Sequence, residues 1–199
     1  LGGIDETGLS DILEAYDAIP EKLTVIRRIL DQGFTTQDLL ENYGQHNENI
    51  LEAEYRLNFP TIEKHINAFS IIVFSPFTKT TLELSVCLNM HLDTLNNILD
   101  VSFIKLDGDN VKIASEAFNS YLKLRLSNAK NEAHSHISSI IEGRDKTADN
   151  FFTMLNYKFS ESDYEGILGE LNDDSIIKVY KEKASLNVLT HVLNIAIQS

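Results

Sequence analysis

The stretch that decides the fold runs from Phe77 to Leu122 and reads FTKTTLELSVCLNMHLDTLNNILDVSFIKLDGDNVKIASEAFNSYL. Its apolar residues predict two helices, Thr80 to Leu88 and His91 to Ser102, separated by Asn89-Met90. Two short runs around an Asp-Gly corner then predict a β-hairpin, and a further helix from about Ser115 closes the unit. This order predicts a winged helix-turn-helix with a short β-hairpin wing.

The wing is predicted from two extended runs, Phe103 to Leu106 and Val111 to Ile113. Gly108, in the corner between them, accepts the positive φ that tight hairpin turns demand. Ser115 follows the second run and is a favourable N-cap for the closing helix. The apolar side of that helix is expected to consist of Phe118, Tyr121, Leu122 and Leu124.

Upstream of the winged unit, apolar residues recur at the spacing of amphipathic helices. Pro20 and Gly33 mark the breaks between the first three helices, and a fourth, strongly apolar helix ends before Pro76. Thr35 with Asp38 predicts the start of the third. The fourth helix is expected to supply most of the winged unit's core. The apolar positions are Leu9, Ile12, Leu13 and Tyr16; Leu23, Ile26, Ile29 and Leu30; Leu39, Leu40 and Tyr43; and Ile62, Ile66, Phe69, Ile72 and Val73.

From Asn128 to Ser199 the pattern predicts successive helices joined by short turns. The last run, Leu186 to Ile197, is so apolar that another helix is expected against one of its sides, as in a solenoid. The chain is therefore mostly α. The apolar positions before that run are Ile137, Ile140 and Ile141; Phe151, Phe152, Met154, Leu155 and Tyr157; Tyr164, Ile167, Leu168 and Leu171; and Ile176, Ile177, Val179 and Tyr180.

Charge differs between three segments of the 199-residue chain, whose total is −13. Residues 1–56 carry 4 basic and 12 acidic groups (net −8), residues 57–128 carry 6 and 7 (−1), and residues 129–199 carry 7 and 11 (−4). We interpret these segments as a helical segment, a winged-helix domain, and a helical arm or the start of a repeat solenoid. An acidic chain repels phosphate backbones at long range, so nucleic acid would need a local basic patch, which the sequence lacks.

Cysteine content and hydropathy limit the expected compartment. Cys87 is the only cysteine, which excludes a disulfide framework and a cysteine-based zinc site and favours a cytoplasmic location. No apolar run approaches the roughly 20 residues that span a bilayer, and residues 1–4 do not resemble a secretory leader. We therefore expect no membrane partner. The chain also lacks an initiator Met, which is compatible with an excised fragment.

Local motifs for nucleotide and zinc chemistry are absent from the sequence. It contains no phosphate loop, no dinucleotide-binding glycine motif and no H-E-x-x-H zinc motif. The corner from Asp107 to Asn110 lacks the ligand spacing of an EF-hand and is interpreted as a hairpin turn. We expect no catalytic residue, no cofactor and no metal ion in this chain.

Isolated reactive side chains have simpler interpretations than a site. His134 and His136 are two residues apart, on different faces of a helix, and are interpreted as a surface pair rather than metal ligands. Cys87 lies in an apolar helix and is interpreted as a small buried residue, and Ser85 beside it implies no catalytic triad. The histidines without a carboxylate at a motif spacing are His46, His65, His91 and His191.

The predicted recognition helix, His91 to Ser102, lacks the chemistry of DNA reading. It contains no Lys or Arg and carries Asp93 and Asp100, whereas base and phosphate contacts come mainly from basic and amide side chains. In the wing, Lys105 and Lys112 are offset by two aspartates. We therefore expect no nucleic-acid partner and a unit that packs against protein. The expected packing residues are Leu92, Leu95, Ile98 and Phe118.

Four stretches carry a family resemblance through their order along the chain. Ile19 to Leu23 precedes an apolar helix that ends at Gly33, and Ser75 to Ser85 looks like an entry into a helix-turn-helix. Leu106 to Leu122 resembles a wing with its closing helix, and Met154 to Leu171 is similar to a helical arm. This order resembles the region after the ATPase core in signalling ATPases with numerous domains (the STAND class), which act in bacterial defence and in animal and plant innate immunity.

The resemblance implies a non-catalytic relay whose partners are the protein's own ATPase core and a repeat-built sensor. In this class a His at the start of the closing helix often contacts bound ADP; the matching residue here is Ser115, so no nucleotide contact is carried over. The class's phosphate loop is absent from these 199 residues. Two alternatives stay open: a transcription regulator, whose duplex binding would weaken when Lys105 and Lys112 become Glu, and a free-standing adaptor.

Overall fold

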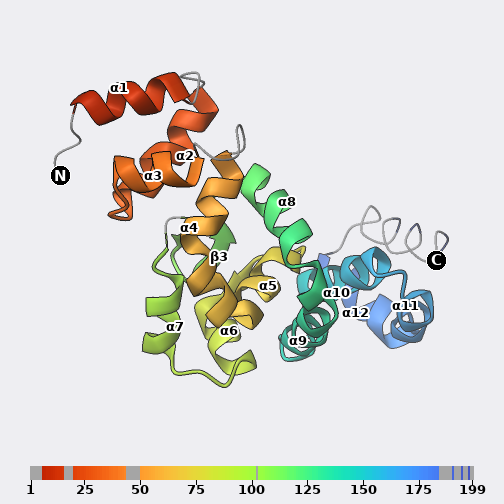
Figure 1. The fold of residues 1–199 in the computed structure, drawn as a ribbon. Helices are drawn as coiled ribbons and strands as arrows, with labels where there is room; N and C mark the ends of the chain where they lie inside the picture. The colour runs from red at the N-terminus through yellow and green to blue at the C-terminus, as the bar shows by residue number, and fades with distance from the viewer. Residues whose placement is uncertain are drawn as a thin grey trace. The chain divides into compact units, whose positions relative to one another are not determined.

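The computed structural model describes residues 6–15, 20–43, 50–101 and 103–183, together with residues 190, 194 and 197. The fold is mostly α-helical with a small antiparallel sheet, as the sequence predicts (Figure 1). The chain divides into two compact units, Leu1–His136 and Ile137–Ser199. Within the described ranges, no helix is both long and apolar enough to cross a membrane.

The first unit begins with four helices that share one apolar core. The predicted start of the third helix is confirmed, because the Asp38 N–H donates to Thr35 Oγ1 at 3.1 Å and Asp38 Oδ2 accepts from the Thr35 N–H at 2.6 Å. The Thr35 hydroxyl and N–H hold the pKa of Asp38 below its ordinary value. The helices are α1 (Glu6–Ala15), α2 (Pro20–Asp31), α3 (Thr36–Tyr43) and α4 (Ile50–Lys64). Their core consists of Ile12, Val25, Ile26, Ile29, Leu39, Ile50 and Ala53.

Some positions of the sequence pattern lie outside the described residues, namely Tyr16, Ile19, Gly44, the run 45–49, Ser102 and most of Leu186 to Ile197. The prediction of a single helix from Ile62 to Val73 is wrong, because the helix is interrupted at His65, between α4 and α5 (Ile66–Phe74). Ile66 is therefore partly exposed while Phe69 is buried, so the apolar stripe is not continuous. Helix α4 runs through residues 56 and 57, where the sequence placed the start of the winged domain.

The winged unit combines α5 with three short strands and three further helices. The sheet order is β1-β3-β2, and both strand pairs are antiparallel. Asp107 faces Asn110 across a two-residue turn within the predicted Asp107 to Asn110 corner, and Gly108 has φ +60° as expected. The Ser115 hydroxyl accepts from the Phe118 N–H at 3.3 Å, so the predicted cap of the closing helix is confirmed. The elements are β1 (Lys79–Thr80), α6 (Thr81–Cys87), α7 (Leu92–Leu99), β2 (Ile104–Asp107), β3 (Asn110–Ile113) and α8 (Glu116–Arg125).

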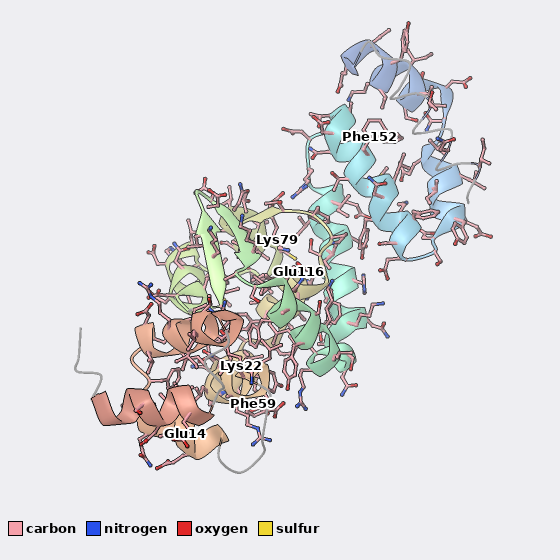
Figure 2. The ribbon with its side chains drawn as sticks, turned by 90° about the horizontal axis from the view of Figure 1, so that it is seen from above. Glu14, Lys22, Phe59, Lys79, Glu116 and Phe152 are labelled. Carbon is pink, nitrogen blue, oxygen red and sulfur yellow. The ribbon has the colours of Figure 1, made fainter. Side chains whose placement is uncertain are left out.

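Strand β1, which the sequence did not predict, ends at Thr80, where the predicted helix begins. Thr80 is the N-cap of α6 in a capping box with Glu83, whose N–H donates to Thr80 Oγ1 at 3.1 Å. Lys79 is buried, and its Nζ donates to the Ile72 carbonyl at 2.9 Å, near the C-terminal end of α5 (Figure 2). A cation at this end of α5 satisfies a carbonyl and complements the helix dipole. The strand thus ties the sheet to α5.

Aromatic side chains build the centre of the winged unit. Phe103 lies between Phe69 of α5 and Phe118 of α8, with ring centroids 5.4 Å apart in both pairs. All three side chains are fully buried. Such tilted and edge-to-face pairs stabilise a core beyond the burial of their area. The closing helix is therefore fixed to α5 through the residue that precedes strand β2.

The second unit is a set of helices, as the sequence predicts. Leu155 and Ile167 form a fully buried cluster in it, and Phe152 is among the partly buried side chains packed against them (Figure 2). Thr147 and Asp163 cap their helices by accepting from the N–H groups of Asn150 and Gly166. The division between the two units falls within α9 (Lys130–Glu142), which follows the short 3₁₀ helix η1 (Ser127–Ala129). The other helices are α10 (Ala148–Ser160), α11 (Tyr164–Glu170) and α12 (Asp173–Lys183).

Candidate protein-interaction surface

The solvent side of α7 occupies the place at which a winged helix reads DNA. His91 caps this helix, and the following Asp93 is exposed, as are Asn96 and Asn97. The His91 Nδ1 lies 3.6 Å from Asp93 Oδ2. The sequence of α7 contains no Lys or Arg. The face therefore offers two amides and a carboxylate, which does not attract a phosphate backbone.

The wing adds little positive charge to this face. Lys105 and Lys112 lie directly opposite each other across the hairpin, and both are exposed. Lys112 Nζ is 3.7 Å from Asp107 Oδ2, which offsets one of the two charges. Asp109 is exposed at the tip. Two lysines and two aspartates leave the wing close to neutral.

Helix α6 exposes apolar side chains beside α7. Leu82 is 62% exposed and Val86 is 73% exposed, and they are four positions apart, so they lie on one face of the helix. Leu82, Leu84 and Val86 do not share one buried face of α6. Residues two apart point to different sides of a helix, and the structure buries Leu84 alone of the three. A helical-wheel argument would have separated Leu84 from the other two.

The four expected packing residues do not share one role. Leu95, Ile98 and Phe118 are buried within the winged unit itself, so they hold it together and face no partner. Leu92 is exposed at the start of α7. Leu82 and Val86 are outward apolar residues of α6 that sequence reasoning missed. We call these two residues, with the exposed side of α7, the α6–α7 face.

Cys87 and His136 meet where α6 contacts α9. Cys87 Sγ lies 3.4 Å from His136 Nδ1 and 3.5 Å from its carbonyl oxygen. Burial raises the pKa of the Cys87 thiol, which opposes the thiolate that a nucleophile requires. Ser85 donates its hydroxyl to the Met90 carbonyl at 2.6 Å. This arrangement serves packing and a local turn.

The two histidines of α9 are half-buried, so their interpretation as a surface pair is wrong. The His134 ring lies 6.2 Å from the ring of Phe74, and Asn67 donates to Glu132 Oε1 at 2.9 Å. The beginning of α9 therefore packs against α5 and α6. No group of three or more metal-ligating side chains occurs among the residues that the structure describes.

Helix α4 forms charged contacts with both of its neighbours. Arg28 of α2 donates its Nε and Nη2 to the two oxygens of Glu54, at 2.8 and 2.7 Å. Burial raises the pKa of Glu54, and Arg28 opposes this shift. Two residues earlier, Glu52 accepts from Arg125 and Tyr121 of α8. Sequence reasoning missed both contacts, because the partners are 26 to 73 residues apart.

Aromatic rings surround the contact between α4 and α8. The Arg125 guanidinium lies over the rings of Tyr55 and Tyr121, 5.4 and 5.2 Å from their centroids. Arg56 donates to Glu52 Oε1 at 2.7 Å. We call Glu52, Arg125 and these two tyrosines the α4–α8 clasp. It fixes the closing helix of the wing to the helix that continues from the N-terminal bundle.

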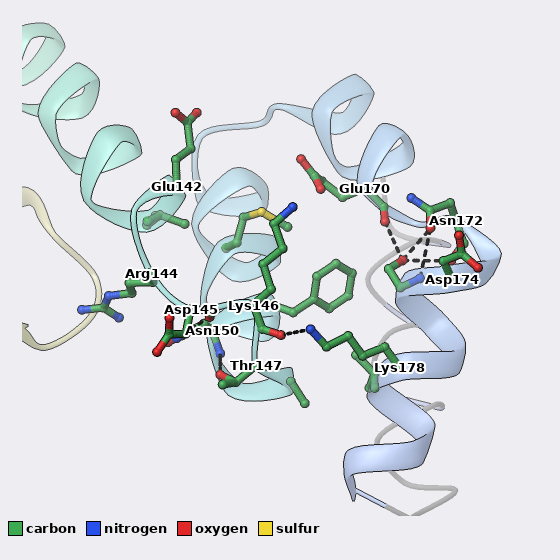
Figure 3. A pocket seen from close by; sticks show the side chains of 16 residues that line it. Glu142, Arg144, Asp145, Lys146, Thr147, Asn150, Glu170, Asn172, Asp174 and Lys178 are labelled. Carbon is green, nitrogen blue, oxygen red and sulfur yellow. Dashed lines mark hydrogen bonds between the residues drawn. The ribbon is translucent and has the colours of Figure 1, made fainter.

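The second unit contains a cleft of about 650 Å³ between α10, α12 and the turn before α10 (Figure 3). Arg144, Asp145 and Lys146 in that turn alternate in charge, and Lys178 of α12 donates to the Lys146 carbonyl. The N–H of Ala148, at the start of α10, donates to Glu182 Oε2 at 2.6 Å. Charges of both signs line this cleft, and a carboxylate of the chain itself occupies the helix N-terminus.

Comparison with known proteins adds no relative. No protein-family model matches the chain, and neither curated proteins nor solved structures give a significant match.

Proposed function

We propose that this chain is a non-catalytic relay region of a multidomain signalling ATPase, which couples a nucleotide-driven switch to a sensor by packing against protein. The observation that carries the proposal is the α6–α7 face. This face combines exposed Leu82 and Val86 with a helix that lacks Lys and Arg, beside a wing of balanced charge. Such a surface favours protein over phosphate as its partner.

The energy available from this face is modest. Full burial of a Leu or Val side chain is worth about 1.5–3 kcal/mol, so the exposed parts of Leu82 and Val86 contribute about 1–2 kcal/mol each. Two such contacts suit a reversible domain interface rather than a permanent one. A relay requires contacts of this strength, because it must exchange packing partners when it moves.

The contacts on both sides of α4 favour motion as one body. Arg28 joins α2 to α4, and Arg125 joins α8 to α4, so a force on the N-terminal helices reaches the wing through side chains in direct contact. The proposed motion is therefore a rotation of the whole first unit against other domains of the parent protein. In this proposal the wing does not rotate separately from α2.

The test begins with the gene, where a phosphate-loop motif within about 300 residues upstream is expected from the size of an ATPase domain. In that full-length protein, Leu82→Glu with Val86→Glu should abolish the ligand-dependent signal, because charges replace the outward apolar contacts. ATP hydrolysis should remain. Leu124→Glu on α8 is the matched control, since Leu124 is 76% exposed and lies outside the α6–α7 face. ATP turnover by the purified 199-residue chain would contradict the proposal.

A further inference from the structure

The second unit exposes an apolar patch where α10 is followed by α11. Phe159 lies near the end of α10, and its ring is 6.2 Å from the ring of Tyr164, at the start of α11. Leu168 is four positions after Tyr164, so these two side chains share one face of the helix. All three side chains are exposed, Leu168 to 59%. We call Phe159, Tyr164 and Leu168 the Phe159 patch.

A glycine beside this patch has no explanation within the described residues. Gly166 is required by the helix cap, because a Cβ there would collide with the Asp163 carboxylate that accepts from its N–H. Gly169 is exposed and lacks a positive φ, and beyond its own helix backbone no described atom lies within 4 Å of the place that a Cβ would take. Glycine weakens a helix relative to alanine, so its use inside one favours the close approach of another backbone.

The charge around the patch is strongly one-sided. Residues 159–177 contain six carboxylates and no Lys or Arg. The neighbouring Lys158 Nζ lies 3.4 Å from Glu170 Oε1 and 3.9 Å from Asp163 Oδ2, so it offsets about one of these charges. A partner must therefore combine apolar side chains with positive charge. This excludes phosphate-rich surfaces and disfavours a second copy of this acidic chain.

We propose that the Phe159 patch binds a basic amphipathic helix of a separate protein. Apolar side chains of that helix would cover Tyr164 and Leu168, its Lys or Arg side chains would face the carboxylates, and Gly169 would let the two helices approach. Residues 184–199 of the chain contain no Lys or Arg, so they lack this charge. Unbalanced surface charge speeds the encounter of molecules that diffuse separately, which favours a separate protein over a tethered domain.

The test uses the whole chain and a synthetic helical peptide of about 18 residues. Leucines lie along one face of the peptide, with an alanine at the centre of that face and lysines on both sides. In a titration followed by ¹H–¹⁵N NMR, the backbone amides of α11 should shift and saturate with a dissociation constant of about 50 μM. A peptide of the same composition in scrambled order keeps the charge without the apolar face and should bind at least about tenfold more weakly. Equal affinities would overturn the proposal.

Variants of α11 locate the contact. Leu168→Ser should weaken peptide binding about tenfold, because it removes the most exposed apolar side chain of the patch. Leu124→Ser on α8 removes a side chain that is 76% exposed outside the patch and should leave the affinity unchanged. Glu165→Gln should weaken binding about threefold, whereas Asp109→Asn at the wing tip should not. If Leu168→Ser and Leu124→Ser bind alike, the site is wrong.

Gly169→Ala distinguishes a partner contact from a structural role. Alanine favours the helix and meets no described neighbour, so this variant should raise the thermal midpoint of the free chain by about 2 °C. It should nevertheless weaken peptide binding at least about threefold, because the added methyl group keeps the two helices apart. A lower thermal midpoint would give the glycine a structural role, and unchanged binding would contradict the close approach.

Two further measurements test the other candidate occupants of the patch. Leu168→Ser should leave the thermal midpoint of the chain unchanged, and a fall of more than about 3 °C would show that the chain's own residues cover the patch. Analytical ultracentrifugation at about 100 μM should show a monomer, and a dimer that Leu168→Ser dissociates would assign the patch to a second copy. Either result overturns the proposal. The inference does not rest on the proposed function, which the Leu82 and Val86 variants test separately.

Discussion

Glu52 and Glu54 lie two residues apart on α4 and have opposite surroundings. Glu54 is fully buried and pairs with Arg28, whose side chain is 16% exposed; Glu52 and Arg125 are 22% and 45% exposed. Residues two apart point to different sides of a helix, so α4 contacts α2 through one carboxylate and α8 through the other. The difference teaches that burial decides how much an ion pair costs to break.

The largest expected effect comes from breaking the buried pair. Arg28→Met leaves the Glu54 carboxylate buried without its charged partner and should lower the free energy of unfolding by about 3–5 kcal/mol. Urea denaturation followed by circular dichroism measures this change. Helices α1–α4 and the winged unit should lose structure in one transition, since α4 belongs to both.

A double variant distinguishes the effect of losing the Arg28–Glu54 ion pair from the cost of leaving the buried Glu54 carboxylate without a partner. Arg28→Met with Glu54→Leu removes both charges and should recover most of the lost stability, because apolar residues of similar volume replace buried pairs well. If the double variant is as unstable as Arg28→Met alone, the pair has a shape role that burial does not explain. Two separate unfolding transitions would show that α4 does not join the two parts.

The α4–α8 clasp should give a smaller effect. Glu52→Gln keeps the shape but removes the charge that accepts from Arg125 and Arg56, so the free energy of unfolding should fall by about 1–2 kcal/mol, discounted for partial exposure. Added salt at about 1 M should reduce the difference from the unmodified chain. Glu63→Gln, an exposed change on the same helix, is the control. A loss as large as that of Arg28→Met would contradict the ranking by burial.

The two carboxylates should also respond to acid in opposite directions. Burial raises the pKa of Glu52, but hydrogen bonds from Arg56 and Arg125 outweigh it, so the folded-state pKa lies below the ordinary 4.5. Its stabilising contribution is therefore complete above pH 4.5 and is lost as the pH falls through the lowered value. For Glu54, burial dominates and raises the folded-state pKa, so its ionisation opposes folding once the pH rises through that value.

Melting temperatures between pH 7 and pH 3.5 test these signs. The advantage of the unmodified chain over Glu52→Gln should shrink on acidification below pH 4.5. Stability relative to Glu54→Gln should instead rise as the pH falls toward 4.5, because protonation relieves the buried charge. Parallel curves for the two variants would show that burial does not separate these carboxylates.

Local signals in the sequence predict much of this fold, and the features they miss depend on contacts between residues that are far apart in the sequence. The Asp-Gly corner and Ser115 predict the hairpin and the cap because turns and caps depend on a few adjacent residues. Strand β1 has two residues, too short for periodicity to detect. The sequence alone shows that α7 in the α6–α7 face has no Lys or Arg, but the exposure of Leu82 and Val86 depends on what packs against α6. The partners of Glu52 and Glu54 depend on tertiary contacts alone.

The exposed pair of the wing completes the series with the smallest effect on stability. The side chains of Lys112 and Asp107 are 52% and 71% exposed and lie 3.7 Å apart, so Asp107→Asn should change the free energy of unfolding by no more than about 0.5 kcal/mol.

The same change alters the charge of the wing, and Asp107→Asn with Asp109→Asn leaves two lysines without an acid. This variant should gain weak duplex DNA binding at about 50 mM salt that disappears near 200 mM, whereas the unmodified chain should bind at neither. Fluorescence anisotropy of a labelled duplex measures both, and binding by the unmodified chain would contradict the assignment of the α6–α7 face to protein.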